Sequence, residues 1–238
     1  MTLPQRDAPA FVAAIVVAAG SGRRLGAGIN KVLLPLARRP ILRRSVDALC
    51  ADPRVMSVRV VIRPEDEADV TQALSGGRWP DLRCVHGGKE RADSVRHGLD
   101  AVDPRAQLVL VHDAARPLLP ATVLSAVIDA GLAHGAAIPA VPIADTLKRV
   151  RDGIVRETVD RSELAAAQTP QAAKPELLRA AYAQWPADGP PPTDEAQLLE
   201  RAGVRVAVVA GDATNLKITT AADLALAEFL CGRTEGST

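Results

Sequence analysis

Residues 11–31 read FVAAIVVAAGSGRRLGAGINK, and this stretch decides which fold the chain can adopt. Residues 11–18 form a continuous apolar run with β-branched side chains, which is typical of a strand buried on both faces of a sheet. A glycine-rich loop over 19–30 follows at once, and glycines there let backbone N–H groups approach a phosphate closely. The stretch therefore predicts an α/β protein with a ligand-binding loop after its first strand.

This loop matches neither of two common phosphate-binding motifs. It contains no Gly-Lys-Ser/Thr sequence, and Leu25 stands where the dinucleotide fingerprint requires its third glycine. It does combine glycines with Arg23, Arg24 and Lys31, and cations beside backbone N–H donors suit a triphosphate. A tight turn with solvated arginines is the structural alternative.

The rest of the chain continues the alternation of strand and helix patterns. Strands are predicted over 55–62, 82–85, 107–113, 136–142 and 204–211. Helices are predicted over 40–50, 64–76, 87–102 (after a turn), 121–134, 175–185, 193–203 and 220–230, with Pro40 in a first turn and Thr193 as an N-cap. This order is typical of a doubly wound, mostly parallel sheet.

Residues 143–160 interrupt that order. Two strand-like segments flank a turn at Arg151, Asp152 and Gly153, which predicts a β-hairpin arm. A hairpin does not fit a parallel sheet, and its open edges require cover. We therefore expect a homodimer in which a second copy of the chain covers this arm.

The composition excludes several classes of protein. Lys and Arg total 29 against 28 Asp and Glu, a formal charge of +1, which argues against a nucleic-acid-binding surface. No apolar run of membrane-spanning length and no signal peptide is present, so no membrane partner is expected. The three cysteines form no metal or redox pattern and are expected to stay reduced in the cytoplasm. The 238 residues, of which 47% are hydrophobic, suit a single domain over 1–238 with a short N-terminal extension over 1–10.

Asp113 ends the predicted strand over 107–113. Ligands of open α/β sheets bind at the carboxyl ends of strands, and a carboxylate there suits Mg²⁺ together with phosphate oxygens. An N-cap or loop aspartate is the alternative. Arg116 follows three residues later, where it either pairs with Asp113 or holds a substrate.

Eight motifs follow one another between residues 18 and 220: AAGSGRRLGAGINK, GGKERADSV, VHDAARP, DTLKR, TVDR, QTPQ, TDEA and NLKIT. As an ordered set they resemble the 2-C-methyl-D-erythritol 4-phosphate cytidylyltransferases, which use CTP in non-mevalonate isoprenoid biosynthesis. The resemblance implies a Rossmann-like nucleotidyltransferase fold, a mostly parallel sheet with a protruding β-hairpin arm. It further implies Mg²⁺ dependence, a homodimer with interlocking arms, and transfer of CMP from CTP to methylerythritol phosphate with release of pyrophosphate.

The resemblance assigns roles to individual residues. Arg24 and Lys31 are the implied catalytic cations, which neutralise the α-phosphate while the acceptor phosphate attacks, so that no general base is needed. The implied nucleotide-binding residues are Ala18, Ala19, Gly20, Gly22, Gly88, Lys89, Arg91 and Ser94. The implied substrate-binding residues are Asp113 (also the metal ligand), Arg116, Thr146, Arg161, Thr169, Thr193 and Lys217, with Thr146 and Arg161 reaching the partner subunit's substrate. Ser94 as a helix hydroxyl bonded to its own backbone is the alternative for that residue.

Two residues depart from the family pattern. Lys89 stands where several members carry an acidic residue, which affects base affinity if the side chain takes part. Asn30 replaces the proline commonly found before the catalytic lysine, which can loosen the loop.

Three other functions compete with this interpretation: a ribitol-5-phosphate cytidylyltransferase, a sugar-phosphate nucleotidyltransferase using another nucleotide, and a non-catalytic nucleotide-binding module. The segments HDAARP, DTLKR and VDR are more similar to the methylerythritol family. A protein that only binds a nucleotide does not require Arg24, Lys31, Asp113 and Lys217 together. Their joint presence therefore counts against a non-catalytic binding module.

Overall fold

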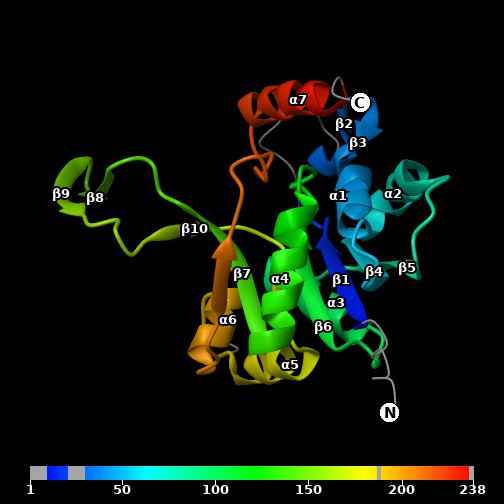
Figure 1. The fold of residues 1–238 in the computed structure, drawn as a ribbon, viewed down its shortest axis with the longest axis horizontal. Helices are drawn as coiled ribbons and strands as arrows, with labels where there is room; N and C mark the ends of the chain where they lie inside the picture. Colours follow the sequence, from blue (N-terminus) through cyan, green and yellow to red (C-terminus); the bar gives the residue numbers. More distant parts are fainter. Residues whose placement is uncertain (1–9, 21–29, 187–188, 236–238) are drawn as a thin grey trace, which may run out of the picture.

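The computed structural model describes residues 10–20, 30–186 and 189–235, with the side chains of 233–235 left aside. Its central sheet confirms the predicted α/β class (Figure 1). Strand β1 (Val12–Val17) lies between β4 (Val55–Ile62) and β6 (Leu108–Asp113), parallel to both. Strand β5 (Leu82–His86) extends the sheet in parallel beyond β4. Val17 pairs with Asp113 in this register, so the glycine-rich loop and the carboxylate leave the sheet side by side.

The sheet continues beyond β6 with short strands that the sequence pattern did not predict. Strand β11 (Gln171–Ala173) is antiparallel to both β6 and β7 (Ala136–Pro142). Strand β10 (Ala165–Ala167) also pairs with β7 in antiparallel fashion. Strand β12 (Ala207–Ala210), predicted over 204–211, pairs with β7 in parallel. Strands β10 and β11 therefore both pair with β7, and residues 168–170 separate them.

Helices cover both faces of the sheet because β1 alternates its side chains between two apolar clusters. On one face, Val12, Ala14 and Val16 pack with α1 (Ile41–Leu49), α2 (Glu67–Leu74) and α4 (Ala121–His134). On the other face, Ala13 and Ile15 pack with α3 (Arg91–Asp100), α5 (Pro175–Gln184) and α6 (Glu195–Arg201). The last helix, α7 (Ala221–Glu235), packs near the small hairpin of β2 (Pro35–Leu36) and β3 (Arg39–Pro40).

The predicted hairpin arm is confirmed. Among the strands of the described residues, β8 (Leu147–Arg151) and β9 (Ile154–Val159) pair only with each other, and Figure 1 shows them far from the body of the molecule. Asp152 and Gly153 form the turn with positive φ values of 54° and 74°. Val150, Ile154 and Val155 on this arm are each more than half exposed.

Two details of the predicted helix starts are wrong. Asp194, not Thr193, is the N-cap of α6, because its Oδ1 accepts the N–H of Gln197 at 2.9 Å. A carboxylate at this position also interacts favourably with the helix dipole, which a hydroxyl does not. Pro40 lies one residue before the first turn of α1 rather than within it. Across the described residues, no helix combines the length and apolar character needed to cross a membrane.

A substitution of Gly98 in α3 tests how closely this helix packs on the sheet. A Cβ added there would lie 2.6 Å from Cγ2 of Ile15 and 2.9 Å from Cγ2 of Val61, both in the core. We expect Gly98→Ala to lower the free energy of unfolding by about 1–3 kcal/mol through overpacking. The matched control is Gly232→Ala in α7, where an added Cβ meets nothing within 4 Å. Thermal and denaturant unfolding of both variants measure the difference; equal stability of the two would contradict this packing.

Candidate functional site

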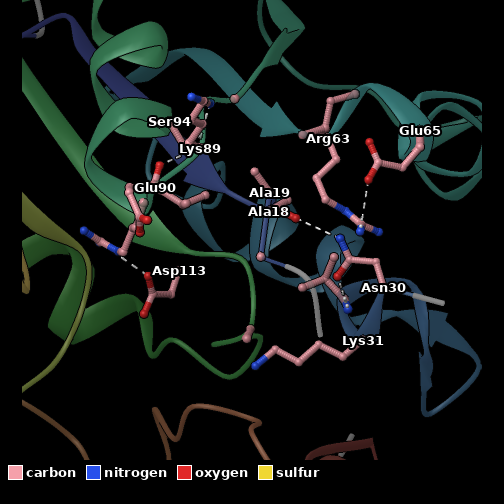
Figure 2. A pocket seen from close by; sticks show the side chains of 18 of the residues that line it. Ala18, Ala19, Asn30, Lys31, Arg63, Glu65, Lys89, Glu90, Ser94 and Asp113 are labelled. Atoms are coloured by element: carbon pink, nitrogen blue, oxygen red, sulfur yellow. Dashed lines mark hydrogen bonds and ion pairs between the residues drawn. The ribbon is translucent and has the colours of Figure 1, made fainter. Parts of the chain in front are cut away.

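A cavity of about 670 Å³ opens at the carboxyl ends of β1, β4, β5 and β6 (Figure 2). Such an edge is where open α/β sheets bind ligands. Many of the residues predicted from sequence line it: Ala18, Ala19, Gly20, Lys31, Gly88, Lys89, Arg91, Ser94, Asp113 and Lys217. The structure therefore brings together the first loop, the segment after β5 and the end of β6.

The other predicted residues either lie outside the described part of the chain or do not line this cavity. Gly22 and Arg24 lie outside the described residues. Thr146 and Arg161 flank the arm and are exposed, with Arg161 donating to the carbonyls of Ile143 and Ala144. Thr193 precedes α6, where its N–H donates to Oε1 of Gln197 at 2.8 Å.

Asp113 is the charged centre of the cavity. Its Oδ2 lies 2.7 Å from Nζ of Lys217, and its Oδ1 lies 3.4 Å from Nη2 of Arg91. Burial alone would raise the pKa of Asp113, but the charges of Arg91 and Lys217 outweigh burial and lower it to about 2. The carboxylate is therefore ionised at neutral pH. It does not cap α4, which begins only at Ala121, so the N-cap alternative is wrong.

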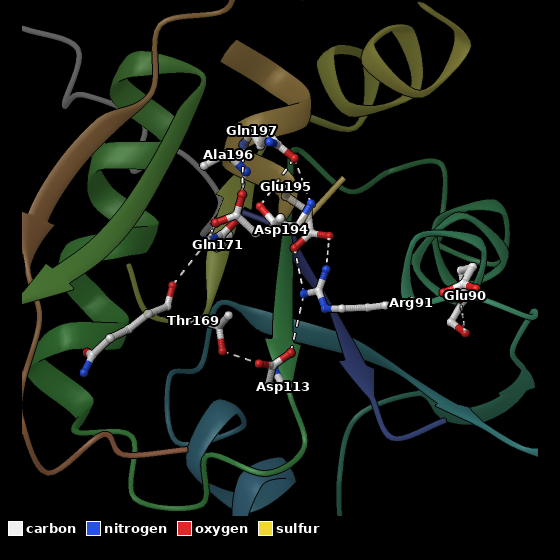
Figure 3. Close-up of polar contacts among 12 residues, drawn as sticks. Glu90, Arg91, Asp113, Thr169, Gln171, Asp194, Glu195, Ala196 and Gln197 are labelled. Atoms are coloured by element: carbon white, nitrogen blue, oxygen red, sulfur yellow. Dashed lines mark hydrogen bonds and ion pairs between the residues drawn. The ribbon is translucent and has the colours of Figure 1, made fainter. Parts of the chain in front are cut away.

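Arg91 is shared between two carboxylates (Figure 3). Its Nη1 and Nη2 donate to Oε1 and Oε2 of Glu195 at 2.7 and 3.0 Å, while Nη2 also reaches Asp113. Glu195 is 2% exposed. Sequence reasoning missed Glu195 as a site residue, although it lies in the quoted TDEA segment. A buried carboxylate requires such a partner, so Arg91 and Glu195 hold each other in place beside the site.

Gln171 of strand β11 forms hydrogen bonds with the residues on either side of Glu195. Oε1 of Gln171 accepts the N–H of Ala196 at 2.9 Å, and its Nε2 donates to Oδ2 of Asp194 at 3.0 Å (Figure 3). The first turn of α6 is thereby attached to the central sheet.

Thr169 lies behind Asp113 rather than in the cavity. Its Oγ1 accepts the N–H of Asp113 at 3.1 Å and its hydroxyl donates to Nδ1 of His112 at 3.1 Å. Nε2–H of His112 in turn donates to the carbonyl of Arg116 at 3.1 Å. Burial lowers the pKa of His112 to about 4, so the ring is neutral and fits both bonds. Thr169 thus supports the backbone on which Asp113 stands.

Arg116 does not form the ion pair with Asp113 that was one of its two predicted roles. Its Nη1 donates to the carbonyl of Asn215 at 2.7 Å, so its guanidinium attaches to the loop before α7. Its Nε is buried with no partner in the structure.

Lys31 stands near the same loop. Its Nζ donates to the carbonyl of Ile218 at 2.8 Å, and Ile218 directly follows Lys217. Two ammonium groups from opposite ends of the chain therefore converge on one loop at the cavity edge. Compact, strongly hydrated cations of this kind suit phosphate oxygens as point charges.

The segment after β5 packs tightly against the first loop. The hydroxyl of Ser94 accepts the N–H of Gly88 at 3.1 Å and donates to the carbonyl of Glu90 at 3.1 Å, which is the structural alternative stated above. A Cβ at Gly87 would lie 2.6 Å from Oγ of Ser94 and 2.9 Å from Cβ of Ala19, so this position requires glycine. Ala18 donates its N–H to Val61 and accepts from the Asn30 amide, which leaves one carbonyl lone pair for a ligand.

The carboxylate of Asp113 suits a magnesium site in which a bound nucleotide supplies part of the ligands. No group of three or more His, Cys, Asp or Glu side chains is arranged to hold a metal within the described residues. Mg²⁺ in nucleotide enzymes is bound by one or two carboxylates plus phosphate oxygens, with waters completing the shell. Asp113 offers one ionised carboxylate of this kind, and the phosphate oxygens of a bound nucleotide would have to supply further ligands.

Comparison with known proteins supports the resemblance. Residues 12–233 match the family IspD, described as 2-C-methyl-D-erythritol 4-phosphate cytidylyltransferase. The protein of that name from Symbiobacterium thermophilum is 46% identical over 220 residues, 92% of each chain. The protein of that name from Prochlorococcus marinus is 43% identical over 215 residues, 90% of this chain and 95% of the other.

The fold comparison agrees. A crystal structure of 4-diphosphocytidyl-2C-methyl-D-erythritol synthase from Anaerococcus prevotii is 31% identical with a TM-score of 0.83, covering 94% of this chain and 100% of that one. The matched region of the family, residues 12–233, includes every described residue that lines the cavity as well as the whole arm. The chain therefore belongs to the 2-C-methyl-D-erythritol 4-phosphate cytidylyltransferase family.

Proposed function

We propose that the protein transfers CMP from CTP to 2-C-methyl-D-erythritol 4-phosphate, which yields 4-diphosphocytidyl-2-C-methyl-D-erythritol and pyrophosphate. The observation that carries this proposal is the convergence of Lys31, Lys217 and the ionised Asp113 on one cavity beside the glycine-rich loop. Family membership supplies the nucleotide and the acceptor.

The reaction joins two anions, so fixed charge is its main requirement. An oxygen of the acceptor phosphate forms a bond to the α-phosphorus of CTP, and the bond to the bridging oxygen of the β-phosphate breaks as pyrophosphate leaves. Lys31 and Arg24 would neutralise the α-phosphate as negative charge develops there, and Lys217 would hold phosphate beside Asp113. Mg²⁺, which Asp113 would hold together with phosphate oxygens, supplies further positive charge when bound.

The acceptor phosphate is already a nucleophile at neutral pH, so the chain has no need of a general base. His112 directly precedes Asp113 and has the chemistry of a base, but its ring is fully buried and both nitrogens are engaged. Its place beneath the site agrees with a structural role.

The arm would complete the site from a second copy of the chain. Val150, Ile154 and Val155 are exposed on a hairpin that has no cover within one chain, and such edges favour association. Thr146 and Arg161 flank the arm and do not reach the cavity of their own chain. Homodimerisation through the arm would bring them to the acceptor bound by the partner subunit.

Replacement of Lys31 tests the assignment of this cavity. We expect Lys31→Ala to lower pyrophosphate release from CTP and methylerythritol phosphate by at least about 100-fold, because the variant lacks one of the cations that neutralise the α-phosphate. CTP binding should remain measurable by calorimetry. Lys174→Ala, which removes a lysine outside the cavity, is the matched control and should turn over normally. Turnover of Lys31→Ala at the wild-type rate would contradict the mechanism.

The arm is tested by hydrodynamic mass. We expect the wild type to sediment at twice the 25.0 kDa of one chain, and a variant lacking residues 147–159 to sediment as a monomer with little activity. Val155→Asp should weaken the dimer because it places a charge on the apolar arm. Val208→Asp, at an exposed valine of β12, is the matched control and should leave the mass unchanged. A dimeric arm-deleted protein would refute this role of the arm.

A further inference from the structure

Asn30 directly precedes Lys31, and both the nitrogen and the oxygen of its side-chain amide form hydrogen bonds. It is 1% exposed. Its Nδ2 donates to the carbonyl of Ala18 at 2.9 Å and to Oδ2 of Asp66 at 2.8 Å, so both amide hydrogens have partners. Its Oδ1 accepts the N–H of Val32 at 3.3 Å. Asn30 itself is therefore firmly held, while residues 21–29 of the loop, to which the expectation of loosening refers, lie outside the described residues.

Asp66 is fixed in turn by a forked ion pair. Nε and Nη2 of Arg63 lie 2.8 and 2.6 Å from Oδ2 and Oδ1 of Asp66. Nη1 of Arg63 lies 3.2 Å from Oε1 of Glu65, and Figure 2 shows these two side chains facing each other. Burial would raise the pKa of Asp66, but the hydrogen bonds from Arg63 and Asn30 outweigh it and hold this pKa below its ordinary value. The carboxylate thus remains an acceptor for Asn30 throughout the neutral pH range.

This network joins three segments that end at the cavity. Ala18 follows β1, Asp66 ends the short helix η3 (Pro64–Asp66) after β4, and Val32 lies in the short helix η2 (Lys31–Leu33). Lys31 begins η2, so its backbone is fixed by the cap that Asn30 provides. Its ammonium is fixed separately by the carbonyl of Ile218.

We infer that Asn30, held by Asp66 and Arg63, is a positioning residue that sets the location of Lys31 against the phosphates of CTP. This inference rests on the proposed function, in which Lys31 is the catalytic cation. A proline at position 30, as the family pattern commonly has, offers neither a side-chain donor nor an acceptor. In this chain a hydrogen-bond network therefore fixes the residue before Lys31.

The first test is the split between kcat and KM. Asn30→Ala should lower kcat about 10- to 100-fold, because a small displacement of a catalytic group is costly, while the KM for methylerythritol phosphate stays within about threefold. Asp69→Asn, at an exposed carboxylate of α2, is the matched control and should behave as the wild type. Wild-type kcat in Asn30→Ala would overturn the inference.

The second test separates positioning from stability. We expect Asn30→Ala and Lys31→Ala each to weaken CTP binding measured by calorimetry, leaving cytidine binding unchanged. In the double variant CTP should bind no more weakly than in Lys31→Ala alone, because Asn30 acts through Lys31. Additive losses, or equal losses for CTP and cytidine, would show that Asn30 supports the fold generally and would overturn the inference.

Two further variants keep the test decisive if Asn30→Ala folds poorly. Arg63→Lys keeps the charge but loses the forked pair with Asp66, and should show a smaller loss of kcat in the same direction. Asp66→Ala removes the acceptor that holds the amide of Asn30 and should lower kcat in the same direction. Normal kcat in both variants would contradict the network. A fully active Lys31→Ala would instead refute the proposed function itself.

Discussion

The carboxylate of Asp113 is the interaction on which the rest of the site depends. Arg91 of α3 and Lys217 of the loop before α7 approach its two oxygens, while Thr169 holds its backbone N–H. Three distant segments of the chain thus converge on the end of β6. A carboxylate this deep is tolerated only with such partners, and the same partners keep it ionised.

The fold explains why this convergence is possible. The parallel strands bring the first loop, the segment after β5 and Asp113 to one edge. The antiparallel β11 then enters between β6 and β7, which places Thr169 behind Asp113 and lets Gln171 hold the start of α6. Through α6 the sheet also fixes Glu195, and through Glu195 it fixes Arg91. Positioning of the charged groups is therefore built on the most buried part of the molecule.

Much of this was predictable from local patterns. The apolar run over 11–18 and the strand that ends at Asp113 are strong signals, and the arm is marked by its turn at Asp152 and Gly153. The strands β10 and β11 were missed because each spans only three residues and contains mainly alanine, which carries no strand signal.

Two contacts that sequence reasoning did not predict, one of Glu195 and one of Asn30, are long-range. Glu195 pairs with a residue 104 positions away, and Asn30 bonds a carboxylate 36 positions away. Contacts between residues so far apart in the sequence produce no local motif from which they could be predicted. Thr169 and Ser94 lie in segments that resemble the family, but only the structure shows that their hydroxyls are bonded within the protein.

In the proposed function, this cavity joins CMP to methylerythritol phosphate. The most direct measurement is pyrophosphate release by the purified protein with CTP and Mg²⁺, comparing methylerythritol phosphate with ribitol 5-phosphate as acceptor. We expect turnover that strongly prefers methylerythritol phosphate. A preference for ribitol 5-phosphate, or no turnover with either acceptor while CTP still binds, would contradict it.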